Sequence, residues 1–119
     1  MIWITKEMIN VKGGEYDRTA LMNAALEGHA KIVELLLNKG ADVDVRSSLD
    51  LDGFPYPGWE AIHFATCNGH LDVAKLISKK HPKVFTAKTN DGETLLSLAR
   101  RCNQINIINW LQKEKSVTE

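Results

Sequence analysis

The chain has 119 residues, of which 44% are hydrophobic and 25% charged, and its 15 Lys and Arg residues balance its 15 Asp and Glu residues. This length fits one domain over residues 1–119, and the composition is that of an ordinary globular protein. The net charge of zero lacks the basic footprint of a dedicated nucleic-acid binder, and no apolar stretch is long enough to span a bilayer, so we expect neither a nucleic-acid nor a membrane partner.

Residues 1–15 are predicted to form an N-terminal cap or a truncated repeat. The start, MIWITKEMI, has neither a basic leader nor a long apolar core, so we expect no secretory signal. Residues 6–12 match the hairpin arm that follows Gly40 later in the chain. The apolar residues of this segment either cover the exposed side of the next unit or form an adhesive end that pairs with another copy or another protein.

Residues 16–48 form the first complete unit, which we interpret as two short antiparallel helices. A helix over residues 20–27 is expected to end at Gly28, because glycine adopts the left-handed conformation cheaply. A second helix, closed by Lys39 and Gly40, has apolar residues at the i, i+3 and i+4 spacing of one buried stripe. The stripe consists of Ile32, Val33, Leu35, Leu36 and Leu37.

A long loop over residues 46–59, with an insertion at residues 49–57, leads into the second unit. Just before it, Val43 and Val45 alternate with aspartates, which is typical of the arm of a short hairpin. The loop carries five apolar residues, three of them aromatic, and these argue against disorder. They either fold back onto their own unit or face a partner as anchors. These residues are Leu49, Leu51, Phe54, Tyr56 and Trp59.

The pattern recurs in residues 58–89, where a helix over residues 61–68 precedes Gly69. A weaker third copy occupies residues 90–119, with a helix over residues 95–102 and Asn103 in the place of the glycine. We interpret this third copy as a repeat that also caps the C-terminal end, because a stack needs a polar outer face. The polar residues of its last helix are Asn106, Asn109 and Gln112.

These units together resemble the ankyrin repeat family over roughly residues 6–113. The family signature is Thr-Pro-Leu-His-x-Ala-Ala, then Gly-His, an apolar helix and Gly-Ala-Asp-Val-Asn. The first copy matches at Thr19, Leu21, Ala24, Ala25, Gly28, His29, Gly40, Ala41, Asp42 and Val43. The second aligns over residues 60–66 and matches at His63, Ala65, Gly69 and His70, and the third keeps Gly92, Thr94, Leu96 and Ala99. The signature proline is missing throughout, and Glu60 replaces the capping threonine of the second copy.

The resemblance implies an all-α solenoid of about three helix–turn–helix units joined by hairpin-like turns. It also implies a concave face built from the hairpin tips and the first helix of each unit. We expect this face to bind a protein partner, as an adaptor or an inhibitor, because aromatic residues and arginine tend to dominate protein interfaces. The candidate binding residues are Tyr16, Arg18, Glu27, Phe54, Tyr56, Trp59, Asn68, Glu93 and Arg101.

We find no sequence pattern for catalysis, a metal or a cofactor. Cys67 has His63 nearby on the same helical face, but the sequence shows neither an oriented base nor an oxyanion site. The simplest interpretation of Cys67 and Cys102 is two reduced thiols in a cytoplasmic protein, with the nucleus as the alternative location. We expect a monomer. The alternative is a self-associating structural unit that uses the apolar N-terminal end.

Overall fold

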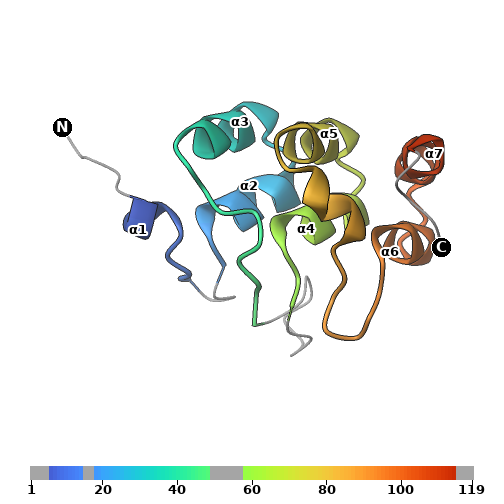
Figure 1. Cartoon of the computed structure of the whole chain (residues 1–119), viewed down its shortest axis with the longest axis horizontal. Coiled ribbons are helices and arrows are strands. Elements are labelled where there is room, and N and C mark those ends of the chain that lie inside the picture. The colour runs from blue at the N-terminus through green and yellow to red at the C-terminus, as the bar shows by residue number, and fades with distance from the viewer. Residues whose placement is uncertain (1–5, 15–17, 49–57, 115–119) are drawn as a thin grey trace.

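The computed structural model describes residues 6–14, 18–48, 58–114, and these form a stack of helical hairpins (Figure 1). Helices α2, α4 and α6 lie side by side in one row, and we call them the inner helices. Helices α3, α5 and α7 form the second row, the outer helices, and a 3₁₀ helix, η1, follows α5. The elements are α1 (Lys6–Ile9), α2 (Ala20–Glu27), α3 (Ala30–Asn38), α4 (Ala61–Cys67), α5 (Leu71–Lys80), η1 (Pro82–Thr86), α6 (Leu95–Arg101) and α7 (Ile105–Lys113).

The packing of these helices confirms the predicted all-α solenoid. Each inner helix packs against the outer helix that follows it, α2 on α3, α4 on α5 and α6 on α7. The inner helices also pack on one another, α2 on α4 and α4 on α6. Within the described residues the hairpins hold isolated bridges rather than strands, at Gly13–Arg18 and Ser47–Trp59. We number the three helix pairs repeats 1, 2 and 3.

The inner helices begin at equivalent residues with local hydrogen bonds. Thr19 Oγ1 accepts a 3.1 Å hydrogen bond from Met22 N, and Thr94 Oγ1 accepts one of the same length from Ser97 N. Such side-chain caps satisfy amides that the first turn of a helix leaves without an intrahelical acceptor. At Glu60 the backbone N–H donates instead to His63 Nδ1, at 2.9 Å.

The inner helices also end alike, as the sequence predicts. The residue that reverses the chain has φ of 77° at Gly28, 76° at Gly69 and 57° at Asn103. All three values lie in the left-handed region, where glycine and then asparagine are the least costly residues. The chain therefore enters each outer helix with the same geometry.

The predicted apolar stripe of α3 is only partly correct. Val33 and Leu37 are buried, but the side chains of Ile32 and Leu35 are 48% and 54% exposed. Val73 in repeat 2 and Ile107 in repeat 3 are equivalent to Ile32, and both are fully buried. The difference follows from stacking, because repeat 1 has no complete repeat before it among the described residues.

The segment before repeat 1 differs from its prediction. We expected residues 6–12 to form a hairpin arm, but Lys6–Ile9 forms one helical turn, α1. Asn10 then fastens this segment to repeat 1, since its Oδ1 accepts a 2.8 Å hydrogen bond from Asp42 N. None of the described helices has both the length and the apolarity needed to cross a bilayer.

Candidate protein-binding face

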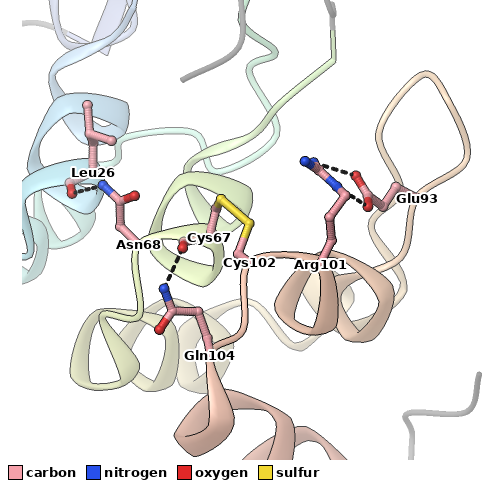
Figure 2. The surroundings of a disulfide bond; sticks show 7 residues. All are labelled: Leu26, Cys67, Asn68, Glu93, Arg101, Cys102 and Gln104. Carbon is pink, nitrogen blue, oxygen red and sulfur yellow. Dashed lines mark hydrogen bonds and ion pairs between the residues drawn. A yellow bond between two sulfur atoms is a disulfide. The ribbon is translucent and has the colours of Figure 1, made fainter. Parts of the chain in front are cut away.

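The candidate face lies along the inner helices and the hairpin tips that precede them. At the C-terminal ends of these helices, side chains of one repeat reach the backbone of the repeat before it. Asn68 Nδ2 donates a 2.9 Å hydrogen bond to the carbonyl of Leu26, and His70 Nε2 lies 3.0 Å from the same oxygen. Gln104 Nε2 donates a 2.7 Å hydrogen bond to the carbonyl of Cys67, as Figure 2 shows. These contacts set the register of the inner helices.

Cys67 and Cys102 form a disulfide that joins α4 to the end of α6 (Figure 2). The expectation of two reduced thiols is therefore wrong for this structure. The Cα atoms are 5.3 Å apart, within the usual range for a disulfide. The pairing is diagonal: Cys102 is equivalent to Asn68 and Cys67 to Leu26, the two residues that meet at the preceding repeat boundary.

Glu93 and Arg101, both predicted binding residues, form a bidentate ion pair. Arg101 donates two hydrogen bonds to the Glu93 carboxylate, 2.9 Å from Nε to Oε2 and 3.0 Å from Nη2 to Oε1. The side chain of Arg101 is 60% exposed and that of Glu93 is 21% exposed. A two-point pair of this kind fixes the plane of the guanidinium group while leaving much of it open to a partner.

Glu27 is exposed, unlike Arg18, the other predicted binding residue of repeat 1 that the structure describes. Its Oε2 lies 3.3 Å from Nε2 of His29, and both side chains are more than half exposed. Asn68 is half-buried and already bonded to Leu26. The exposed part of the candidate face therefore includes Glu27 and Arg101 at opposite ends of the inner row.

Arg18 and Trp59, both predicted for the exposed binding face, are instead buried, so this part of the prediction is wrong. They are equivalent residues, each just before the start of an inner helix, and both pack on Phe64. The guanidinium carbon of Arg18 lies 4.9 Å from the centroid of the Phe64 ring, and the Trp59 ring lies 5.1 Å from it. The sequence did not predict that Arg18 and Trp59 would both pack on the ring of Phe64 in repeat 2.

The other predicted binding residues, Tyr16, Phe54 and Tyr56, lie outside the described residues. The same is true of Leu49 and Leu51. Of the five apolar residues assigned to the long loop, Trp59 is thus the one whose packing the structure describes. Trp59 packs against its own repeat, as one of the two alternatives for the loop predicts, and does not face a partner as an anchor.

Arg46 organises the hairpins beside this face, and the sequence analysis missed it. Its Nη1 donates hydrogen bonds of 2.9 Å to the carbonyl of Gly58 and 2.8 Å to that of Lys88. Its Nη2 lies 3.2 Å from the buried carboxylate of Glu60. One side chain thereby joins two successive hairpins to the start of α4. A hydrophilic residue in a loop gave no signal of this role in the sequence.

Burial shifts the proton affinity of two groups at the start of α4. Desolvation raises the pKa of Glu60, although the charge of Arg46 opposes the shift. Desolvation lowers the pKa of His63 to about 4, with a smaller contribution from Arg46 in the same direction and an opposing one from the backbone of Ala87. His63 is therefore a neutral structural residue at pH 7, and its Nδ1 accepts from Glu60 N.

The described residues, 6–14, 18–48 and 58–114, hold no cluster of side chains suited to a metal ion. No three side chains of His, Cys, Asp or Glu gather there in a way that could hold a metal ion. His70, a histidine near the end of α4, contacts the Leu26 carbonyl. Cys67, which we weighed as a nucleophile, is bonded to Cys102.

The stacked hairpins and their shared inner face define a helical repeat protein. Residues 16–48 match the family description "ankyrin repeat", and residues 47–119 match "ankyrin repeats (3 copies)". The second match alone covers more than half of the chain. The chain belongs to the ankyrin repeat family, and such repeats generally bind other proteins without catalysis.

Relatives of known name share this region as one part of a longer protein. Mouse "Ankyrin repeat and SAM domain-containing protein 6" is 30% identical over 112 residues, which are 82% of this chain and 12% of that protein. Rice "Probable E3 ubiquitin-protein ligase XBOS33" is 34% identical over 88 residues, 74% of this chain and 15% of that protein. The human "Notch-regulated ankyrin repeat-containing protein" is 30% identical over 67 residues, 56% of this chain and 52% of that protein. The chain thus spans less than two thirds of each relative's length.

Proposed function

We propose that this chain is a non-catalytic adaptor or inhibitor that binds a protein partner along the inner helices and the hairpin tips. The observation that carries the proposal is the Glu93–Arg101 pair. The side chain of Arg101 is 60% exposed, and its two hydrogen bonds to Glu93 hold it in one orientation. An arginine fixed in this way loses little conformational freedom when it binds a carboxylate or an aromatic ring.

Affinity capture with matched variants tests this proposal. We would compare the intact chain with a Glu27→Ala/Arg101→Ala variant as baits in a lysate of the source cell. Both changed side chains are exposed, so the fold should persist. A Lys31→Ala/Lys79→Ala variant, changed at exposed positions of the outer helices, is the control. The proposal predicts a protein captured by the intact chain and by the control and lost with the inner-face variant. A protein retained by all three baits would contradict the proposed face.

The alternative function, self-association through the N-terminal end, also has a specific observation in its favour. Ile32 and Leu35 on α3 are each about half exposed, whereas Val73 and Ile107, the equivalents of Ile32 in the later repeats, are fully buried. Met8 and Val11, in and after α1, are 52% and 62% exposed. Apolar side chains at the open end of a stack are suited to pairing with a second surface.

Light scattering over a range of concentrations distinguishes the two functions. Self-association predicts an oligomer that an Ile32→Lys/Leu35→Lys variant disperses. The control is Ile105→Lys, which changes a side chain of α7 that is 59% exposed. A monomer at every concentration would reject self-association and leave the adaptor or inhibitor proposal standing. A cytoplasmic location, with the nucleus as the alternative, stays a prediction.

A further inference from the structure

The bond between Cys67 and Cys102 occupies a place that a reversible contact fills elsewhere in the stack. Between repeats 1 and 2, Asn68 reaches back to the carbonyl of Leu26 through a 2.9 Å hydrogen bond. Between repeats 2 and 3, the equivalent residues are Cys102 and Cys67, and their side chains are joined covalently. The fold therefore brings these two positions together at each boundary, whatever residues occupy them.

The neighbouring residues hold the two sulfur atoms close together and leave the cysteines only half-buried. Gln104 donates its 2.7 Å hydrogen bond to the carbonyl of Cys67, directly beside the bond between the sulfurs. Packing of α4 on α6 brings the backbones close. Both cysteines are half-buried rather than fully buried, so a small thiol or disulfide has access to them.

We propose that Cys67 and Cys102 form a thiol–disulfide exchange site whose reactants are low-molecular-weight thiols and disulfides of the glutathione class. This assignment goes beyond partner binding and does not depend on it. The site converts the docking of repeat 3 on repeat 2 from a reversible contact into a covalent one.

The exchange balances in two steps. The thiolate of one cysteine attacks oxidised glutathione, which forms a mixed disulfide and releases one glutathione thiolate. The thiolate of the other cysteine then attacks the protein sulfur of the mixed disulfide and releases the second glutathione thiolate. The protein loses two electrons and two protons, and one oxidised glutathione becomes two molecules of reduced glutathione. Excess reduced thiol drives the reverse sequence.

Closure of this bond acts on one boundary of the stack. In stacked repeats each unit is stabilised by contacts with its neighbours, and these contacts open locally. The bond spans a sequence separation of 35 residues and encloses α5, η1 and α6. Opening of α6 away from α4 is therefore restricted in the oxidised chain and free in the reduced chain, while α2 and α3 lie outside the loop.

Equilibration of the full chain in glutathione buffers of increasing oxidised fraction tests the chemistry. Samples are quenched with acid, separated from glutathione, unfolded in guanidinium chloride, alkylated with iodoacetamide at mildly alkaline pH and weighed by mass spectrometry. We expect one transition from two alkylated cysteines to none, with the mass of an internal disulfide. The control, Cys102→Ser, should stop at a glutathione adduct on Cys67. Two alkylated cysteines, or two glutathione adducts, in the most oxidising buffer would overturn the proposal.

Hydrogen exchange of the intact chain, with and without a dithiol reductant, tests the consequence. We expect reduction to speed exchange of the amides of Leu98 and Ala99 in α6 roughly tenfold or more, and to leave that of Val33 in α3 unchanged. The Cys67→Ser/Cys102→Ser variant should not respond to the reductant. Unchanged exchange in α6 on reduction of the wild-type chain, or an equal change in α3, would overturn it.

Discussion

His70 and Gln104 hold the same place in successive repeats and contact the same part of the preceding repeat. His70 Nε2 lies 3.0 Å from the carbonyl oxygen of Leu26, and Gln104 donates a 2.7 Å hydrogen bond to the carbonyl of Cys67. Leu26 and Cys67 are themselves equivalent, so a histidine and a glutamine make the same contact at successive boundaries. The two boundaries therefore share the geometry of this contact although the residue types differ.

The glycines of the turns make room for these contacts, and Gly69→Ala tests this. A Cβ at Gly69 would collide with the amide end of Gln104, and φ there is 76°. We expect a loss of about 2 kcal/mol in the free energy of unfolding, from the left-handed conformation and the disturbed hydrogen bond together. Urea unfolding measures it.

Gly92→Ala is the matched control for that change. Its φ is 80°, but nothing lies within 4 Å of an added Cβ. We therefore expect only the conformational cost, about 1 kcal/mol. In a Gln104→Ala background Gly69→Ala should become nearly as mild as the control. Equal losses for both glycines in the wild-type background would show that the Gln104 contact contributes nothing.

Arg46→Met should destabilise the chain by about 2–3 kcal/mol, because it leaves the buried carboxylate of Glu60 without its cation. The figure is discounted for the 41% exposure of the Arg46 side chain. Lys83→Met, which breaks an ion pair to Asp44 with both side chains about 60% exposed, should cost less than about 1 kcal/mol.

Adding Glu60→Gln to Arg46→Met checks the cause of that loss. A neutral amide needs no cation, so the second change should recover part of the stability. Chemical denaturation of the wild type, of Arg46→Met, of Glu60→Gln and of the double variant gives the coupling energy between the two residues. Simple addition of the two single effects would contradict a direct interaction between Arg46 and Glu60.

The buried His63 should make stability fall as the solution becomes acidic. Its pKa is about 4 in the folded chain, below the ordinary value of 6.5, so the unfolded chain binds the proton more tightly. The stabilisation is complete above pH ~6.5 and is lost as the pH falls towards ~4. We expect a loss of about 2 kcal/mol between pH 7 and pH 5.

His63→Gln should remove most of this dependence. The raised pKa of Glu60 acts in the opposite direction, since it favours the protonated folded state at low pH, and it operates equally in both variants. Urea unfolding at the two pH values provides the measurement. An unchanged slope in His63→Gln would mean that another group is responsible.

Equivalent positions at the two ends of the stack should respond differently to the same change. Ile107→Ala removes a fully buried side chain of α7 and should cost about 2–5 kcal/mol. Ile32→Ala, at the equivalent and 48% exposed position of α3, should cost less than about 1 kcal/mol. Similar losses at both positions would show that Ile32 is covered in solution.

The sequence was sufficient for the inner helices because their boundaries depend on local chemistry. Gly28, Gly69 and Asn103 mark the ends of the inner helices, and Thr19 and Thr94 cap two of the starts. The exposure of Ile32 could not be predicted in this way. Periodicity identifies an apolar face, but only the arrangement of repeats decides whether a neighbour covers it.

The candidate site was predicted less well because it depends on contacts between repeats. The pattern places Trp59 and Arg18 on the binding face, but both turn inward onto Phe64. The bond between Cys67 and Cys102 joins adjacent columns of the alignment, so matching equivalent residues did not reveal it. Glu93 and Arg101 were both predicted for the face, and the structure brings them together.

Photo-crosslinking in the source cell tests the central claim most directly, that the inner row of helices is the surface for a protein partner. A photoreactive amino acid would replace Ser97, one turn before Arg101 on α6, in one variant and Lys31 on α3 in the other, both exposed positions. Arg101 itself stays in place to bind the partner. We predict a covalent adduct of one defined protein from position 97 and none of that protein from position 31. The same adduct from both positions, or from position 31 alone, would contradict the account.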